Sequence, residues 1–219
     1  MKKNIAMRVA AILFILTMIS TCAFSTTFAK YVTSDEATDT ARVAKWGVEV
    51  NLAGFEMYDT NYDGTVISST TDKLVAPGTG SELAGISITG KPEVKVEVKY
   101  EATLVLDEEE WKIGSDEYCP IIFTVNTETY GTNDTNATHK STDIAALIVA
   151  VEEAIEAYTA EYDANADLNT ATTPSVSWAW AYSTSDANDV KDTALGDAAA
   201  AGNAPTISLE LTVTVTQVD

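Results

Sequence analysis

The feature that most constrains the fold is an unbroken alternation of side chains between residues 93 and 106. Every even position from Val94 to Leu106 is apolar, and every odd position from Glu93 to Glu101 is charged. Because successive side chains of a strand point to opposite faces, this pattern predicts a strand with one buried and one solvated face. Such strands are typical of antiparallel sheets that cover a core on one side.

Further stretches have strand character and are separated by polar turns. The last of them, Ile207–Gln217, places aliphatic residues at odd positions and mainly threonine at even ones. Repeated short strands with polar connections favour an antiparallel β-sandwich, jelly-roll-like in its connections. The sequence therefore predicts a mostly β fold, with the additional strands at residues 41–52, 82–89, 119–125 and 176–182.

One segment departs from the period of two. Between Asp143 and Tyr162 the apolar residues follow helical spacing, which predicts one amphipathic helix inserted at about residues 142–163. Ser141 or Thr142 is the expected N-cap. The stretch from 183 to 203, rich in Asp and Ala, is expected to be a long connection.

The first 29 residues have the pattern of an export signal. A basic start is followed by an apolar run at 9–20 and by small residues that end at Thr27-Phe28-Ala29. This predicts cleavage between Ala29 and Lys30, with an earlier cut after Ala23 as an alternative. The apolar run is short for a membrane span of about 20 residues, so we expect no stable membrane insertion after cleavage. The expected parts are a signal peptide (1–29), an arm (30–40) and a single sandwich domain (41–219).

Charge limits the partners of the exported chain. The full sequence carries 13 basic and 33 acidic residues, a net charge of −20. Loss of residues 1–29 removes Lys2, Lys3 and Arg8 but no acid, which leaves a net charge of −23. Such a surface repels nucleic acid and anionic lipid, so neither is an expected partner. Cys119 is the single cysteine beyond residue 29, so no internal disulfide is expected.

A short acidic stretch matches the first half of a calcium loop. Asp59, Asn61, Asp63 and Thr65 stand at alternate positions, with a glycine after Asp63. Hard oxygens at this spacing suit calcium, although Thr70 occupies the position at which a bidentate carboxylate would complete the loop. A hairpin turn is the favoured interpretation and calcium the alternative. No other cofactor is expected.

Catalytic patterns are sparse. His139 is the single histidine, so neither a zinc-protease HExxH pair nor a histidine–cysteine zinc cluster can form. No G-x-S-x-G nucleophile motif occurs, and a Cys119–His139 pair has no support beyond the presence of both residues. The chain is therefore predicted not to be an enzyme. The aromatic stripe of Trp178, Trp180 and Tyr182 fits a sugar-binding platform, but packing in the core is the favoured interpretation.

Several motifs, taken in order, suggest a family. They are Thr27-Phe28-Ala29 followed by Lys30-Tyr31, the 41–50 strand with Gly47, Ala76-Pro77-Gly78 with the later Gly90 turn, Asp192 to Gly196 after Trp178-Ala179-Trp180, and the terminal strand. In these features the chain resembles the TasA/camelysin-like secreted proteins of Gram-positive bacteria, whose precursors depend on the signal peptidase SipW.

The resemblance implies an extracellular or cell-surface structural protein with a jelly-roll sandwich. It implies self-association into biofilm-matrix or pilus-like fibres, with the signal peptidase as a partner during export. In such fibres an N-terminal arm acts as a donor strand for the next subunit. Carried onto this sequence, the arm begins at Lys30, Tyr31, Val32 and Thr33. A glycan- or wall-binding module and a camelysin-like extracellular protease are the alternatives.

Overall fold

The computed structural model describes residues 7, 9–19, 42–52, 57–58, 73–81, 84–182 and 186–218. These residues belong to two compact units, Met1–Val43 and Ala44–Asp219, each of which is described by itself. In the first unit residues 9–19 are helical. No helix in the described ranges is long and apolar enough to cross a membrane.

The second unit is built mainly of strands. Its elements, in chain order, are β1 (Val48–Asn51), β2 (Ala84–Gly85), β3 (Ser87–Gly90), β4 (Val96–Leu106), β5 (Lys112–Ile113), β6 (Asp116–Glu117), β7 (Ile121–Val125), β8 (Glu128–Thr132), β9 (His139–Ser141), α2 (Ile144–Glu156), β10 (Ala160–Tyr162), the 3-10 turn η1 (Leu168–Thr170), β11 (Ser175–Trp180), α3 (Asp186–Ala200) and β12 (Ile207–Gln217).

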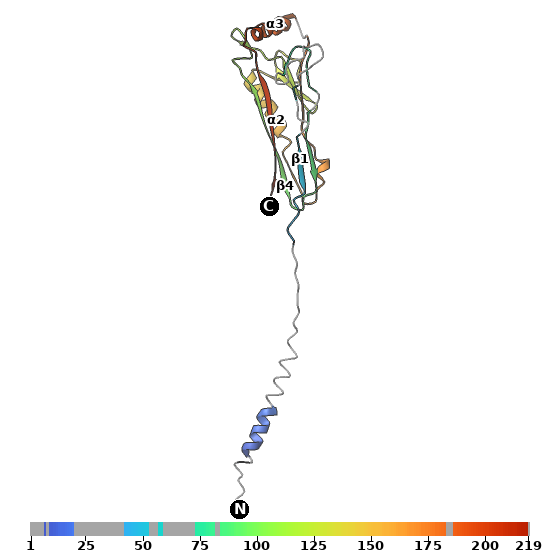
Figure 1. The fold of residues 1–219 in the computed structure, drawn as a ribbon, viewed down its shortest axis with the longest axis vertical. Helices are drawn as coiled ribbons and strands as arrows, with labels where there is room; N and C mark the ends of the chain where they lie inside the picture. The colour runs from blue at the N-terminus through green and yellow to red at the C-terminus, as the bar shows by residue number, and fades with distance from the viewer. Residues whose placement is uncertain are drawn as a thin grey trace, which may run out of the picture. The chain divides into compact units, whose positions relative to one another are not determined.

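Two sheets organise these strands. One has the order β10-β4-β12 and the other the order β2-β11-β7-β8-β9, while β1 pairs with β3 and β5 with β6. The ladders are antiparallel except for β8 with β9, which is parallel. In Figure 1 the long strands β4 and β12 run side by side, as their eleven-residue register requires. The predicted fold class, mostly β with antiparallel sheets, is confirmed.

A single hydrophobic cluster joins the two sheets, as expected of a sandwich. The even-numbered side chains of β4 are buried and the odd-numbered ones mostly exposed, so the alternation seen in the sequence sets the strand's inner face. Trp178 on β11 and Phe123 on β7 stand directly opposite each other, and they are large buried side chains that the other sheet contributes to the core. Burial of large aromatic side chains in this cluster is a major source of the domain's stability.

Helix α2 forms because apolar residues recur every three or four positions. Its buried side chains are Ile144, Leu147, Val151 and Ile155. The cap differs from the prediction: Asp143, not Ser141 or Thr142, accepts a hydrogen bond from the backbone N–H of Ala146 at 2.8 Å. This bond and one from Thr142 lower the pKa of the Asp143 carboxyl.

The predicted end of this helix, near residue 163, is wrong. The helix stops at Glu156, and Tyr162 lies in β10 opposite Val96 of β4. The two tyrosines at 158 and 162 keep helical spacing, but backbone pairing with β4 determines the conformation of the second one. Local periodicity has been overridden by a partner that is distant in sequence.

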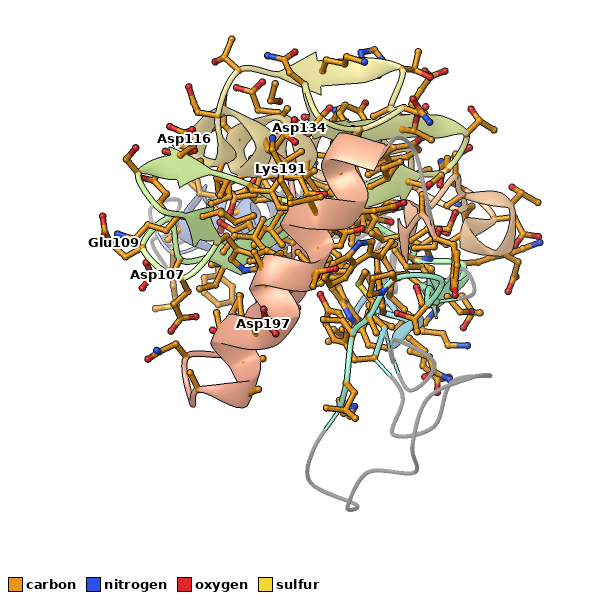
Figure 2. All side chains as sticks on the ribbon, turned by 90° about the horizontal axis from the view of Figure 1, so that it is seen from above. Asp107, Glu109, Asp116, Asp134, Lys191 and Asp197 are labelled. Atoms are coloured by element: carbon orange, nitrogen blue, oxygen red, sulfur yellow. The ribbon has the colours of Figure 1, made fainter. Side chains whose placement is uncertain are left out.

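A second helix occupies the stretch that was expected to be a connection. Alanines favour helix in α3, yet Leu195 is its single described side chain that is fully buried, so an amphipathic pattern is lacking. Polar contacts attach α3: Lys191 pairs with Asp134 at 2.9 Å, and Tyr118 donates a hydrogen bond to Asp192 at 2.6 Å. Burial, together with Asp192, raises the pKa of Tyr118. Figure 2 shows Lys191 beside Asp134, with Asp197 further along the helix.

The start of β12 is held by three hydrogen bonds to Thr206. The indole N–H of Trp111 donates to its carbonyl oxygen at 2.7 Å. The carboxylate of Glu110 accepts from both its backbone N–H and its hydroxyl, at 2.9 and 2.8 Å. Together these bonds fix where the final strand begins relative to the turn that follows β4.

The first predicted strand, at residues 41–52, is shorter than expected. Only Val48–Asn51 pairs with β3, and Trp46 lies before the paired segment with 43% of its surface exposed. Gly90 is required at the pairing site, because a Cβ there would lie 1.8 Å from the carbonyl oxygen of Gly47. Its φ of +117° also disfavours any other residue.

Candidate functional site: the open edge of the three-stranded sheet

The first candidate site is β12, one of the two edge strands of the β10-β4-β12 sheet. It pairs with β4 from Ile207 opposite Leu106 to Gln217 opposite Val96. Its aliphatic side chains at 207, 209, 211, 213 and 215 are only half-buried, although they point toward the core cluster. In the described part of the chain no strand pairs with the other side of β12. An apolar face and an unpaired backbone therefore lie together.

The direction of the unpaired backbone groups follows from the bonds of β4. The N–H groups of Leu104 and Tyr100 donate to the side chains of Glu152 (2.9 Å) and Thr159 (3.1 Å), away from β12. Residues of a strand alternate in the side to which their N–H and C=O point, so the odd residues of β4 bond β12. Their partners are the even residues of β12. The odd residues of β12 therefore present N–H and C=O outward.

We call these outward groups the open edge: the backbone N–H and C=O of Ile207, Leu209, Leu211, Val213, Val215 and Gln217. The bond from Val218 to the carbonyl oxygen of Lys95 continues the same alternation. Except for the exposed Gln217, the residues of the open edge are also those whose side chains turn inward. A strand that added here would gain backbone hydrogen bonds and apolar contact at the same positions.

The open edge lacks the devices that usually prevent edge pairing. Natural edge strands are shortened, bulged or supplied with proline and lysine. β12 has eleven residues, no proline, no glycine and no lysine, and Glu210 is its single charge. On the neighbouring outer face of β4, Lys99 pairs with Glu101 at 2.8 Å, so these two charges offset each other beside β12. The opposite side of β4 is covered by β10 and α2.

A cavity of about 500 Å³ lies beside the beginning of β12 and under α3. Its lining includes Trp111, Trp180, Pro77, Leu195 and Ile207, so it is largely apolar. The rings of Trp111 and Trp180 lie 6.3 Å apart at their centroids. The indole N–H of Trp180 is buried and has no hydrogen-bond partner among the described residues. A compact ligand with an apolar body and one acceptor would suit this cavity.

The aromatic stripe is divided by the structure. Trp178 and Trp180 are 1% and 6% exposed, which confirms the prediction that they pack in the core. Tyr182 is 79% exposed, so its assignment to the core is wrong. The strand ends at Trp180, and the tyrosine ring lies against Gly78. A flat sugar platform made of all three rings is therefore not present.

Cys119 and His139 have separate surroundings. Cys119 is fully buried, and burial raises the pKa of its thiol to about 12, which disfavours the nucleophilic thiolate. His139 stacks on Tyr130 with centroids 4.7 Å apart and lies 3.1 Å from a Glu128 oxygen. Within the described ranges no group of three or more His, Cys, Asp or Glu residues is placed to hold a metal.

Several residues predicted from sequence to be functional lie outside the described part of the chain. They are the cleavage-site pair Ala29 and Lys30, the arm residues Tyr31, Val32 and Thr33, and the candidate calcium ligands Asp59, Asn61, Asp63 and Thr65. Their roles stay predictions. The open edge was not predicted from the sequence. The period of two in residues 207–217 predicted its apolar inner face but not its unpaired backbone.

Comparison of the chain with known proteins gives no further guide to its function. No protein-family model, curated protein or solved structure matches this chain.

Proposed function

We propose that this chain is an exported structural subunit of extracellular matrix or pilus-like fibres, assembled by β-strand addition. The observation that supports this most directly is the open edge of β12, eleven residues long and backed by half-buried aliphatic side chains. Strand addition derives its affinity from backbone hydrogen bonds and its specificity from alternate side chains. The open edge provides both. The segment at residues 30–40 is the proposed donor strand of the fibre.

Charge sets the conditions for assembly. A net charge of −23 on the exported chain opposes the approach of two copies at low ionic strength. Salt shortens the screening length from about 30 Å at 0.01 M to about 8 Å at 0.15 M. Assembly is therefore expected to increase with salt, and calcium should act at lower concentration than sodium because it also binds carboxylates.

The test uses the purified exported chain, imaged by electron microscopy across a range of sodium and calcium concentrations. Val213→Lys places a charge on the inner side of the open edge, whereas Thr214→Lys places the same charge on the exposed outer face of the same strand. Fibres are expected from the wild type and from Thr214→Lys but not from Val213→Lys. The proposal is wrong if all three proteins stay monomeric in every salt, or if Val213→Lys assembles like the wild type.

Removal of residues 30–40 tests the arm separately. If the arm is the donor strand, the shortened chain forms no fibres while its thermal unfolding is unchanged. Fibres of normal length from the shortened chain would remove the arm from the assembly mechanism and leave the open edge as the proposed surface.

The cavity beneath α3 favours a second candidate, a module that binds a cell-wall component. Its two indole rings, and the N–H of Trp180, which no described residue accepts, suit a ligand with an apolar face and an acceptor. Titration with soluble peptidoglycan fragments should change the tryptophan emission, and Leu195→Trp, which fills the cavity, should abolish the change. Absence of any change at millimolar fragment would reject this candidate.

A further inference from the structure

The chemistry of the open edge specifies the strand that can pair with it. Its outward backbone groups and its inward aliphatic side chains belong to the same odd-numbered residues. In an antiparallel pair, residues directly opposite each other lie on the same face of the sheet. An added antiparallel strand must therefore bring an apolar side chain to every second residue along the inner face.

The arm at residues 30–40 does not have this pattern. Its sequence is KYVTSDEATDT, in which Tyr31 and Val32 are adjacent and would point to opposite faces of a strand. The remaining positions on either face are mostly polar or acidic. Paired with β12, the arm would place carboxylates or hydroxyls against the half-buried aliphatic residues, where they would lack hydrogen-bond partners.

The sequence of β12 itself has the required pattern. We propose that the open edge pairs with β12 of a second copy of this chain, in antiparallel orientation about a two-fold axis at Thr212. This inference rests on the proposed function, in which the open edge is an assembly surface. It makes the two-fold dimer the unit of assembly, so an arm that acts as donor strand would have to add at an edge other than β12. Pairing would join two β10-β4-β12 sheets into one continuous six-stranded sheet.

The parity of the strand determines the register. In a full overlap, residue numbers on the two copies add to 424, so each odd residue faces an odd residue and every outward N–H meets an outward C=O. Leu209 then faces Val215 of the second copy, and Leu211 faces Val213. A slip by one residue would bring odd residues opposite even ones and lose this match.

The outer face is also compatible with two-fold pairing. Glu210 faces Thr214 of the second copy and Ser208 faces Thr216, so no two like charges stand opposite each other. Thr212 faces Thr212 across the axis. Because Glu210 is the single charge on the strand, repulsion between the copies comes from the rest of the domain and is reduced by salt.

The two-fold axis makes a direct test available. Thr212 lies in a pair without mutual hydrogen bonds, where the two Cα atoms are about 4.5 Å apart. This distance is within the range that a disulfide spans, about 4.4–6.8 Å. Thr212→Cys, oxidised with glutathione in the exported chain, should shift to twice the monomer mass on a non-reducing gel. Cys119 is fully buried and should contribute no background.

Thr214→Cys is the matched control. Its side chain is on the same exposed face, two residues away, but it faces Glu210 of the second copy and not itself. On the same non-reducing gel it should run at the monomer mass, because no disulfide can join its two copies, and Glu210→Cys combined with Thr214→Cys should restore cross-linking. The inference is overturned if Thr212→Cys fails to cross-link, or if Thr214→Cys alone cross-links equally well. Adding Val213→Lys to Thr212→Cys should abolish the cross-link.

A second measurement avoids new cysteines. Light scattering should give a dimer mass for the wild type and for Thr214→Lys, and a monomer mass for Val213→Lys, before any fibre appears. If fibres form and are blocked by Val213→Lys, yet Thr212→Cys does not cross-link, the fibre proposal survives and this pairing fails. If Thr212→Cys cross-links but no salt yields fibres, the pairing stands and the fibre proposal fails.

Discussion

Glu152 on α2 closes the protected side of β4, and its replacement by alanine gives the sharpest test of the fold's energetics. Its carboxylate accepts the N–H of Leu104 at 2.9 Å, at a strand position where no backbone partner stands opposite in the described chain. Glu152→Ala leaves a partly buried N–H without its acceptor. A hydrogen bond to a charged group contributes about 1.5–3 kcal/mol to stability.

Two smaller effects adjust this magnitude. Alanine is a better helix former than glutamate by about 0.3 kcal/mol, which acts in the opposite direction. Glu153→Ala gains the same propensity on an exposed neighbouring side chain, so the difference between the two variants isolates the bond to Leu104. We expect that difference to be about 2 kcal/mol, or about 4–8 °C in melting temperature for a domain of this size.

Urea unfolding followed by tryptophan fluorescence measures the difference, and amide exchange at Leu104 locates it. Glu152→Gln keeps an acceptor but loses the charge, so it should recover about half of the loss. If Glu152→Ala and Glu153→Ala unfold at the same urea concentration, the carboxylate does not stabilise β4 and the explanation is wrong.

Two further outcomes follow from the glycine at the β1–β3 ladder and from the buried thiol. In Gly90→Ala the added Cβ would clash with Gly47, so β1 should separate from β3 and the amide of Val48 should exchange fast. At Gly196 nothing lies within 4 Å of an added Cβ, so Gly196→Ala should instead stabilise α3 by about 0.5–1 kcal/mol. Equal effects of the two glycine variants would contradict this. Cys119 should resist iodoacetamide at pH 8 until guanidinium is added. Because the thiol pKa is raised to about 12 from 9.0, its contribution to stability is complete below pH 9 and is lost as pH rises toward 12, so Cys119→Ala should weaken the alkaline loss of stability.

The sequence predicted well the features that depend on short-range periodicity. The alternation around Tyr100 and along Ile207–Gln217 reappears as alternating burial, because the face of a strand is set by neighbouring residues. The helical spacing from Ile144 to Ile155 likewise reappears as the buried side of α2. Each of these patterns can be evaluated without knowing the strand order.

Features that depend on partners distant in the sequence could not be predicted from local periodicity. The end of α2 is set by pairing of Tyr162 with β4, and α3 is held by a few contacts such as Lys191 with Asp134, without an apolar stripe. The open edge is a property of strand order: the sequence of β12 reads the same for a central strand and for an edge strand. Only the arrangement of β4, β10 and α2 establishes which side stays unpaired.

The hydrogen bonds to Thr206 also affect which insertions the chain can tolerate. Before Thr206, the residues from Ala201 to Pro205 form a loop whose side chains are largely exposed, so an extra residue there lengthens only the loop. After Thr206, a single extra residue would shift β12 by one position and bring threonines to the core face in place of Leu209 and Leu211. Insertions should therefore be tolerated in the loop before Thr206, whereas insertions within β12 after Thr206 should disrupt the fold.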